Sequence, residues 1–224
     1  VIPALNEERA IGSVLDAIPT WVDQTVVADN GSTDSTRQIA LRKGALVVEE
    51  VRPGYGSACL RGIEALDPCD IVVFVDADFS DHPEQMDRLV DPIIRGDADL
   101  VIGSRRLGAV EPGALTIPQR FGNALACALI WKFWGVRFTD LGPFRAVRST
   151  TLRSLGMADP DYGWTVEMQI KAAMRSVRCL EVPVDYRRRI GRSKISGTVR
   201  GVVAAGTKIL STIFLTAAKQ RIRL

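Results

Sequence analysis

In the first half of the chain, short apolar runs alternate with segments in which apolar residues recur every three or four positions. Short apolar runs are typical of buried strands, and the longer period is typical of amphipathic helices. The alternation predicts βαβ units, and therefore a mainly parallel sheet with flanking helices. The predicted strands are 1–4, 25–29, 45–49, 71–75 and 100–103. The predicted helices between them are 8–18, 33–43, 55–66 and 83–95.

The second half of the chain has a less regular pattern. We expect a long helix over 117–134, an edge strand over 141–147, a helix over 162–176 and a strand over 180–184. From about Gly197 to Lys219 the helical period returns, with basic residues largely off the apolar face. That face would carry Val203, Leu210, Ile213, Phe214 and Ala217. This pattern predicts a basic amphipathic helix, or two helices that separate near Gly206.

Length and composition are those of one ordinary α/β domain, with 224 residues, 46% apolar and 25% charged. The net charge of +3 indicates no particular partner. His82 is the only histidine, so we expect no histidine metal site or catalytic triad. The four cysteines form no CxxC pair and are typical of buried thiols in a reducing compartment. The chain begins at Val1, inside a predicted strand, and no signal peptide is evident.

The triplet Asp76-Ala77-Asp78 follows the predicted strand 71–75 directly. Backbone alternation points both carboxylates to the same side, at the strand end where open α/β sheets bind ligands. Two like charges held there repel unless a cation lies between them. Oxygen ligands suit Mg²⁺ or Mn²⁺, which would also hold a substrate diphosphate. The alternative is a pair of solvated carboxylates in a turn.

Polar segments also follow the first three predicted strands. PALNEE over 3–8 and DNGSTD over 29–34 could hydrogen-bond a ribose or a base, although helix capping and turn chemistry explain them as well. A glycine-rich loop over 54–58 precedes a helix. Because the next glycine is Gly62, the dinucleotide motif GxGxxG is not matched, and a Rossmann dehydrogenase is disfavoured.

Two groups of cations could bind phosphate. The first group of cations consists of Arg105, Arg120 and Arg145. Each of these arginines follows a strand or lies at the start of a helix. Converging guanidinium groups bind phosphate through planar forks, whereas separate ones form surface salt bridges. The second group lies in one loop and includes Arg189, Arg192 and Lys194. That loop could cover a diphosphate and neutralise its charge.

Together these motifs resemble the inverting family 2 glycosyltransferases of GT-A fold. Within that family, the branch that they resemble most is the dolichyl-phosphate mannose synthase group. The matching stretches are PALNEE (3–8), DNGSTD (29–34), GYGSA (54–58), DADFSDHPE (76–84), GSR (103–105), TDLGPFR (139–145) and GRSK (191–194). Their order and spacing make the resemblance specific to the family over nearly the whole chain. It implies a GT-A catalytic domain over 1–196, Rossmann-like with a mainly parallel sheet, followed by the basic amphipathic segment 197–224.

The resemblance also implies roles for the matching residues. Those of the nucleotide pocket would be Pro3, Leu5, Glu7, Asp29 and Gly56. Asp76 would lie by the ribose and the metal, and Asp78 would ligate Mg²⁺ or Mn²⁺ on the diphosphate. The acceptor phosphate would be held by Arg105 and Arg120, with Arg145 as a further catalytic cation. The residues approaching the donor would be Arg189, Arg192 and Lys194.

Two departures from the family pattern stand out. The stretch 79–83 reads FSDHP where the family usually supplies a Gln to the metal, so Ser80, Asp81 or a water is expected to replace it. The stretch 141–145 reads LGPFR where a Ser-Gly-Phe-Arg pattern is usual. This second departure indicates a subgroup with a different acceptor.

The predicted reaction is the transfer of a sugar from a UDP- or GDP-sugar to a polyprenyl or dolichyl phosphate. That acceptor is already ionised and needs no protein base. The alternative is a glycosyltransferase with a glycan or small-molecule hydroxyl as acceptor, for which Asp140 is the candidate general base. A non-catalytic nucleotide-sugar binder is the least favoured hypothesis.

The basic amphipathic segment is expected to lie on an anionic membrane, which would make the protein cytoplasmic and peripheral on the cytosolic face. A membrane span over 201–218 is disfavoured because Lys208 would lie near its middle. Packing against the catalytic domain or a second copy, as in a homo-oligomer, is the alternative. A nucleic-acid partner is not expected, because the basic loop lacks interleaved aromatic residues apart from Tyr186.

Overall fold

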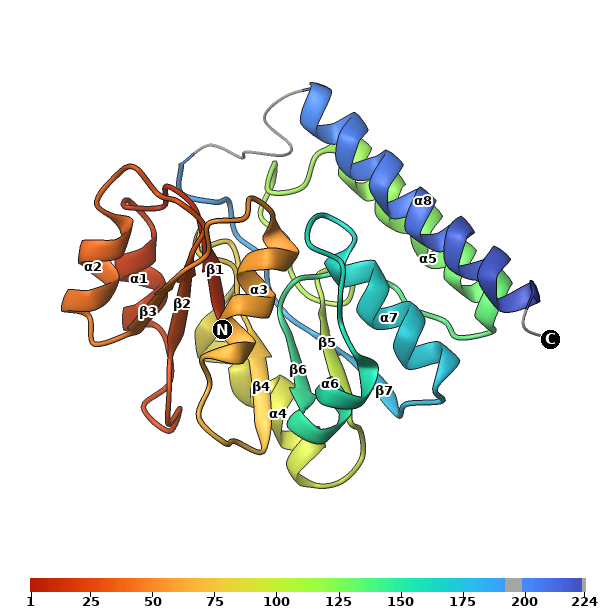
Figure 1. Cartoon of the computed structure of the whole chain (residues 1–224), viewed down its shortest axis with the longest axis horizontal. Helices are drawn as coiled ribbons and strands as arrows, with labels where there is room; N and C mark the ends of the chain where they lie inside the picture. Colours follow the sequence, from red (N-terminus) through yellow and green to blue (C-terminus); the bar gives the residue numbers. More distant parts are fainter. Residues whose placement is uncertain (192–198, 223–224) are drawn as a thin grey trace.

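The computed structural model describes residues 1–191 and 199–222. Across the sheet, neighbouring strands lie in the order β3, β2, β1, β4, β6, β5 and β7. β1 (Ile2–Ala4), β2 (Val26–Asp29) and β3 (Leu46–Glu49) pair in parallel. The second group pairs in the order β4 (Ile71–Phe74), β6 (Arg145–Arg148), β5 (Leu100–Ser104) and β7 (Cys179–Pro183). Two backbone hydrogen bonds, from Val1 N to the Val73 carbonyl at 2.8 Å and from Val75 N to the Val1 carbonyl at 3.2 Å, bring β1 beside β4. The sheet is mainly parallel, as predicted (Figure 1).

One prediction about the sheet is wrong. The expected edge strand over 141–147 is the strand β6, which begins later and lies between β4 and β5, antiparallel to both. Arg145 is fully buried, and Arg148 donates to the Ile93 carbonyl at 2.7 Å. Internal carbonyl partners therefore allow a strand with arginine at both ends to lie inside the sheet.

Helices cover both faces of the sheet. One face is covered by α1 (Ile11–Asp16), α2 (Thr36–Arg42) and α4 (Met86–Ile94), the last preceded by a single 3₁₀ turn, η1 (Pro83–Gln85). The other is covered by α3 (Tyr55–Glu64), α5 (Ile117–Trp134), α6 (Ser149–Leu155) and α7 (Trp164–Met174). Strand alternation supplies both cores, since Val101 packs on the first face and Leu100 and Ile102 on the second.

The C-terminal segment forms one continuous helix, α8 (Val199–Ile222), without a break near Gly206. It lies alongside α5 at one end of the molecule (Figure 1). Ile213 is fully buried in the interface, and Trp134 Nε1 donates to Gln220 Oε1 at 2.7 Å. Across residues 1–191 and 199–222, none of the helices combines the length and the apolar character that a membrane crossing requires.

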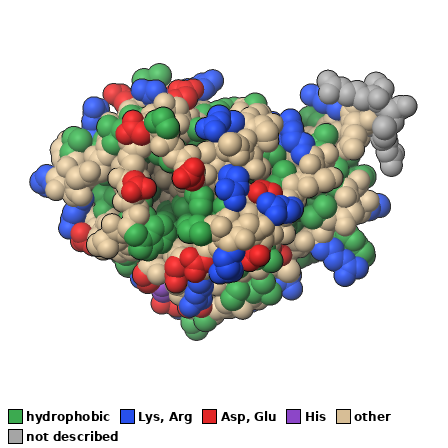
Figure 2. Space-filling view, turned by 90° about the horizontal axis from the view of Figure 1, so that it is seen from below, with side chains coloured by type: hydrophobic (Ala, Val, Ile, Leu, Met, Phe, Trp, Pro, Cys, Tyr) green, Lys and Arg blue, Asp and Glu red, His purple; other side chains and the backbone are tan. Residues whose placement is uncertain are grey.

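The face seen in Figure 2 carries no broad field of one charge. Acidic and basic side chains are interspersed there around patches of hydrophobic side chains. This distribution agrees with the small net charge of +3, and it offers no extended basic track for a phosphate backbone on that face. The absence of a nucleic-acid partner stays a prediction.

Candidate active site

A first pocket, the strand-end pocket, lies at the carboxyl ends of β1 and β4 and has a volume of about 360 Å³. Strand ends converge there because the neighbouring strands are parallel. The structure brings together six of the residues predicted from sequence: Pro3, Leu5, Glu7, Asp76, Asp78 and Arg189. Asn30, Tyr55, Asp161 and Tyr162 also line it. The fold therefore places a pocket of this volume directly beside the carboxylates of Asp76 and Asp78.

The two carboxylates of the Asp-Ala-Asp triplet are held in place by named donors. Tyr55 donates its hydroxyl to Asp76 Oδ1 at 3.0 Å. Ser80 donates both its backbone N–H, at 2.9 Å, and its hydroxyl, at 2.5 Å, to Asp78 Oδ1. Arg189 Nη2 lies 3.0 Å from Asp78 Oδ2, so that a cation from the C-terminal loop already neutralises this carboxylate.

Asp81 is a third carboxylate buried beside this pair, at 1% exposure. Its Oδ2 accepts the Asp76 N–H at 3.3 Å, and within the described part of the chain its buried Oδ1 has no hydrogen-bond partner. Burial first, and then the charge of Asp78, raise the pKa of Asp76 to about 6. Burial, followed by the charges of Asp76 and Asp78, raises the pKa of Asp81 well above its usual value. The three carboxylates therefore concentrate negative charge that a cation would stabilise.

This donor set fits a divalent cation whose coordination is shared with a substrate. In the described ranges no three Asp, Glu, His or Cys side chains are arranged to hold a metal ion by themselves. Mg²⁺ and Mn²⁺ at phosphate sites take one or two carboxylates and complete their coordination with diphosphate oxygens and water. Asp76 and Asp78 supply such a pair, and the unpartnered Asp81 Oδ1 lies close by.

A second, larger pocket of about 700 Å³ lies between the loop after β5, the first half of α5, and α8. We call it the arginine pocket, because its walls include Arg105, Arg106 and Arg120. Burial raises the pKa of Asp76 and Asp81, and the positive charge of Arg105 offsets a small part of that rise. The arginine end of this pocket therefore lies within electrostatic reach of the strand-end carboxylates.

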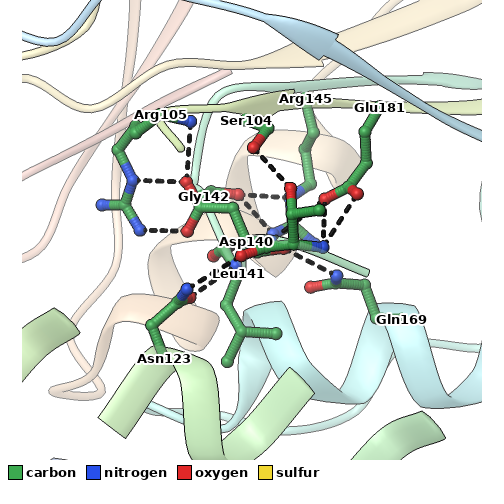
Figure 3. Close-up of polar contacts among 10 residues, drawn as sticks. Ser104, Arg105, Asn123, Asp140, Leu141, Gly142, Arg145, Gln169 and Glu181 are labelled. Carbon is green, nitrogen blue, oxygen red and sulfur yellow. Dashed lines mark hydrogen bonds and ion pairs between the residues drawn. The ribbon is translucent and has the colours of Figure 1, made fainter. Parts of the chain in front are cut away.

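Arg105 is fixed by a two-point ion pair with Asp140 (Figure 3). Its Nε and Nη2 atoms donate to the two oxygens of Asp140 at 2.7 and 2.6 Å, and its backbone N–H donates at 2.8 Å. The Asp140 backbone is held in turn by Glu181 and Gln169. Burial by itself lowers the pKa of Arg105, but the charge and hydrogen bonds of Asp140 outweigh it and raise that pKa. Asp140 therefore positions a permanent cation, and both of its oxygens are engaged.

The prediction that Arg145 joins the phosphate-binding cations is wrong for this structure. Its side chain is fully buried and lines neither pocket. It donates to the carbonyls of Leu141, Gly142 and Thr165. Burial lowers its pKa to about 10, so it stays charged at neutral pH. Arg145 therefore holds the turn that carries Asp140 (Figure 3).

Two residues predicted for the nucleotide pocket lie beside it. Asp29 is buried, and its Oδ1 accepts the Ser32 N–H at 3.3 Å in the turn after β2. Gly56 is buried at the start of α3, where a Cβ atom would clash with the Asp159 carbonyl oxygen. Neither lines the pocket itself, although each adjoins a lining residue in sequence, Asn30 and Tyr55 respectively. Arg192 and Lys194 lie outside the described residues.

Several pocket residues were missed by sequence reasoning. Tyr55 lies inside the glycine-rich loop and Arg106 follows Arg105, so both adjoin segments already singled out. Asp161 and Tyr162 had no such signal, because they come from a loop distant in sequence that packs on the glycine-rich segment. Only the folded chain brings that loop to the strand ends.

Residues 1–157, which include both carboxylates and the Arg105–Asp140 pair, match the model of the family described as glycosyl transferase family 2. The chain belongs to this family. An uncharacterized glycosyltransferase of Mycobacterium tuberculosis is 38% identical, over 92% of this chain and 92% of that protein. The dolichyl-phosphate hexose transferase of Haloferax volcanii is 33% identical, over 100% of this chain and 95% of that protein.

A solved structure of glucosyl-3-phosphoglycerate synthase from Mycobacterium tuberculosis has the same fold. Its TM-score is 0.78, with 29% identity over 97% of this chain and 78% of that one. That crystal contained Mn²⁺, UDP-glucose and phosphoglyceric acid. The proteins similar to this chain therefore include a dolichyl-phosphate hexose transferase and a glucosyl-3-phosphoglycerate synthase.

Proposed function

We propose that this family 2 glycosyltransferase is an inverting enzyme that transfers a sugar from a UDP- or GDP-sugar to the phosphate of a polyprenyl or dolichyl phosphate. The observation that carries the proposal is a pair of pockets, one lined by carboxylates at the strand ends and the other lined by arginines, with Arg105 close enough for its charge to act on Asp76 and Asp81. A donor diphosphate with its cation suits the first, and an anionic acceptor suits the second.

On the donor side, Asp76 and Asp78 would hold Mg²⁺ or Mn²⁺ against the diphosphate, as the Mn²⁺ and UDP-glucose bound by the solved relative suggest. The cation, when bound, would stabilise negative charge on the leaving nucleoside diphosphate. Arg189 lies at Asp78 and is well placed to add positive charge to the same group. Arg192 and Lys194 are proposed to act with it.

On the acceptor side, Arg105 and Arg120 are proposed to bind the phosphate, together with the neighbouring Arg106. A phosphate oxygen would attack the anomeric carbon opposite the leaving group. The bond from that carbon to the diphosphate oxygen breaks, its electron pair leaves with the nucleoside diphosphate, and the anomeric configuration inverts. An ionised phosphate needs no base, which agrees with an Asp140 whose two oxygens are both engaged by Arg105.

The second candidate acceptor is a hydroxyl group of a small phosphorylated molecule. The phosphoglyceric acid bound by the solved relative favours it. In that reaction a base must remove the hydroxyl proton, and Asp140 would have to exchange its pairing with Arg105 for that role. A non-catalytic nucleotide-sugar binder is a third candidate, and the Asp76–Asp78 pair beside Arg189 argues against it.

We further propose that the enzyme works as a peripheral protein on the cytosolic face of a membrane. Several large apolar side chains of α8 are exposed to solvent, among them Val203 at 59% and Leu215 at 61%. A helix that carries exposed apolar side chains and basic residues such as Lys208 and Lys219 suits the interface of an anionic bilayer. Homo-oligomerisation through this same face is the alternative.

The test is nucleoside diphosphate release from UDP-glucose and GDP-mannose with Mn²⁺, with and without a polyprenyl phosphate. Lipid-dependent release that is lost in Asp78→Asn and kept in the surface control Asp97→Asn supports the proposal. Release that requires 3-phosphoglycerate and ignores the lipid supports the second candidate. Donor binding without release under every condition supports the non-catalytic binder.

A further inference from the structure

Two glycines inside helices have no packing reason to be glycine. Glycine destabilises a helix relative to alanine, so a glycine there usually marks a close neighbour. Gly62 in α3 is such a case, since a Cβ atom would lie 2.5 Å from Val1 Cγ1. At Gly122 in α5 and Gly206 in α8, no described atom beyond the local helix backbone lies within 4 Å of the Cβ position.

Gly122 and Gly206 both line the arginine pocket, one from each of the two helices that enclose it. Neither has a backbone conformation that requires glycine. Without a ligand, alanine would therefore fit at both positions, and its helix propensity is higher than that of glycine. The missing side chains leave space between α5 and α8, and that space belongs to a pocket that a ligand can enter.

The pocket is lined by both cationic and apolar side chains. Arg105 and Arg120 supply cations, whereas Leu115, Pro118 and Ile209 supply apolar walls. Its volume of about 700 Å³ is far more than a phosphate group needs. An acceptor that fills it would carry an anionic head and a long apolar body.

We propose that Gly122 and Gly206 determine acceptor specificity by leaving a passage between α5 and α8 for the isoprenoid chain of the acceptor. The phosphate of that acceptor lies at Arg105 and Arg120. This inference rests on the proposed function and adds the residues that select a chain-bearing acceptor over a compact one.

The test replaces each glycine with a side chain that fills the passage. Gly122→Leu and Gly206→Leu are compared with Ala128→Leu on α5 and Ala204→Leu on α8. Both control positions are exposed and lie outside the pocket. Two readouts are measured: the Kd of farnesyl phosphate by calorimetry, and the KM for its use as acceptor. Melting temperature and the Kd of the nucleotide sugar report whether each variant folds.

We expect each glycine variant to weaken farnesyl phosphate binding by about tenfold or more, because a leucine side chain displaces buried methylenes of the ligand. The controls should stay within about twofold, and nucleotide binding should be unchanged in all four. Wild-type affinity in both folded glycine variants would overturn the inference, and so would a wild-type protein that does not bind farnesyl phosphate.

Failure of the proposed function gives a different result. In that case the wild-type protein binds farnesyl phosphate but transfers no sugar to it, while the glycine variants still lose the binding. The calorimetric readout therefore tests the passage between the helices separately from the chemistry of transfer.

Discussion

Arg105 and Asp140 face each other through two parallel hydrogen bonds of 2.7 and 2.6 Å. The pair lies at the wall of the arginine pocket, with the Asp140 side chain 2% exposed and the Arg105 side chain 14% exposed. A fork of this kind fixes the guanidinium plane and directs its remaining donor edge. The pair gives Asp140 a role in orienting the cation that the proposed acceptor meets.

Loss of Asp140 should therefore affect stability and acceptor binding together. Asp140→Ala leaves a buried guanidinium unpaired, and we expect a loss of about 3–5 kcal/mol in unfolding free energy. The double variant Arg105→Ala/Asp140→Ala should be more stable than Asp140→Ala, because the orphaned charge is gone. Urea denaturation of the three proteins measures this. Equal stability of the single and double variants would argue against the pair as a unit.

The same residue separates the two acceptor classes kinetically. If the acceptor is a phosphate, Asp140→Asn should raise the acceptor KM and leave the pH profile of kcat unchanged. If Asp140 is a general base, kcat should fall by about 10²–10⁴ and the acidic limb of the profile should disappear. Steady-state kinetics between pH 5 and 9 distinguish the two outcomes.

Arg145 should prove structural. Arg145→Met removes hydrogen bonds to three carbonyls of the Asp140 turn and its surroundings. We expect it to lower the unfolding free energy by about 3 kcal/mol or more, because the carbonyls stay buried without partners. Arg95→Met, at a surface pair with 60% and 56% exposure, is the matched control and should change stability by less than about 1 kcal/mol. A stable Arg145→Met protein that lacks only acceptor binding would contradict this assignment.

Metal affinity should increase with pH. Burial and the charge of Asp78 raise the pKa of Asp76 to about 6 in the metal-free protein, above its ordinary value of 3.8. Its proton must leave before a cation binds, so Mn²⁺ affinity should rise up to pH 6 and level off above it. By the same linkage, Asp76 makes the metal-free fold less stable as pH rises from about 4 to about 6. Calorimetric titration of Mn²⁺ in the presence of UDP checks the first effect, and a pH-independent affinity would refute it.

Lys208 connects α8 to the strand-end pocket. Its Nζ lies 2.9 Å from Asp159 Oδ2, while Asp159 Oδ1 accepts the N–H groups of Asp161 and Gly163 in the pocket loop. Because Lys208 is 37% exposed, the pair is partly screened by solvent. We expect Lys208→Met to weaken nucleotide-sugar binding by less than about fivefold, and Lys219→Met to leave it unchanged. If neither Lys208→Met nor Lys219→Met changed nucleotide-sugar affinity at low or at high salt, α8 would not be coupled to the donor site.

The chain's own pattern was sufficient for most of the fold. The apolar run 71–75, followed at once by Asp76 and Asp78, predicts both a buried strand and a site at its end, because strand direction fixes where the next polar residues emerge. The helix over 117–134 was correct at both ends, since Thr116 caps it and Gly135 ends it in a left-handed conformation. Local periodicity and end signals are contained in neighbouring residues, and such features can be read without a structure.

The position of β6 and the fate of the arginines were decided by tertiary structure. Arg105 and Arg145 were both predicted from sequence to bind phosphate. In the fold, Arg105 lines a pocket, whereas Arg145 is fully buried against backbone carbonyls. Gly122 and Gly206 likewise line one pocket only because α8 packs alongside α5. Burial and hydrogen-bond partners depend on residues distant in the chain, so the sequence determined which groups could act and the fold determined which of them do.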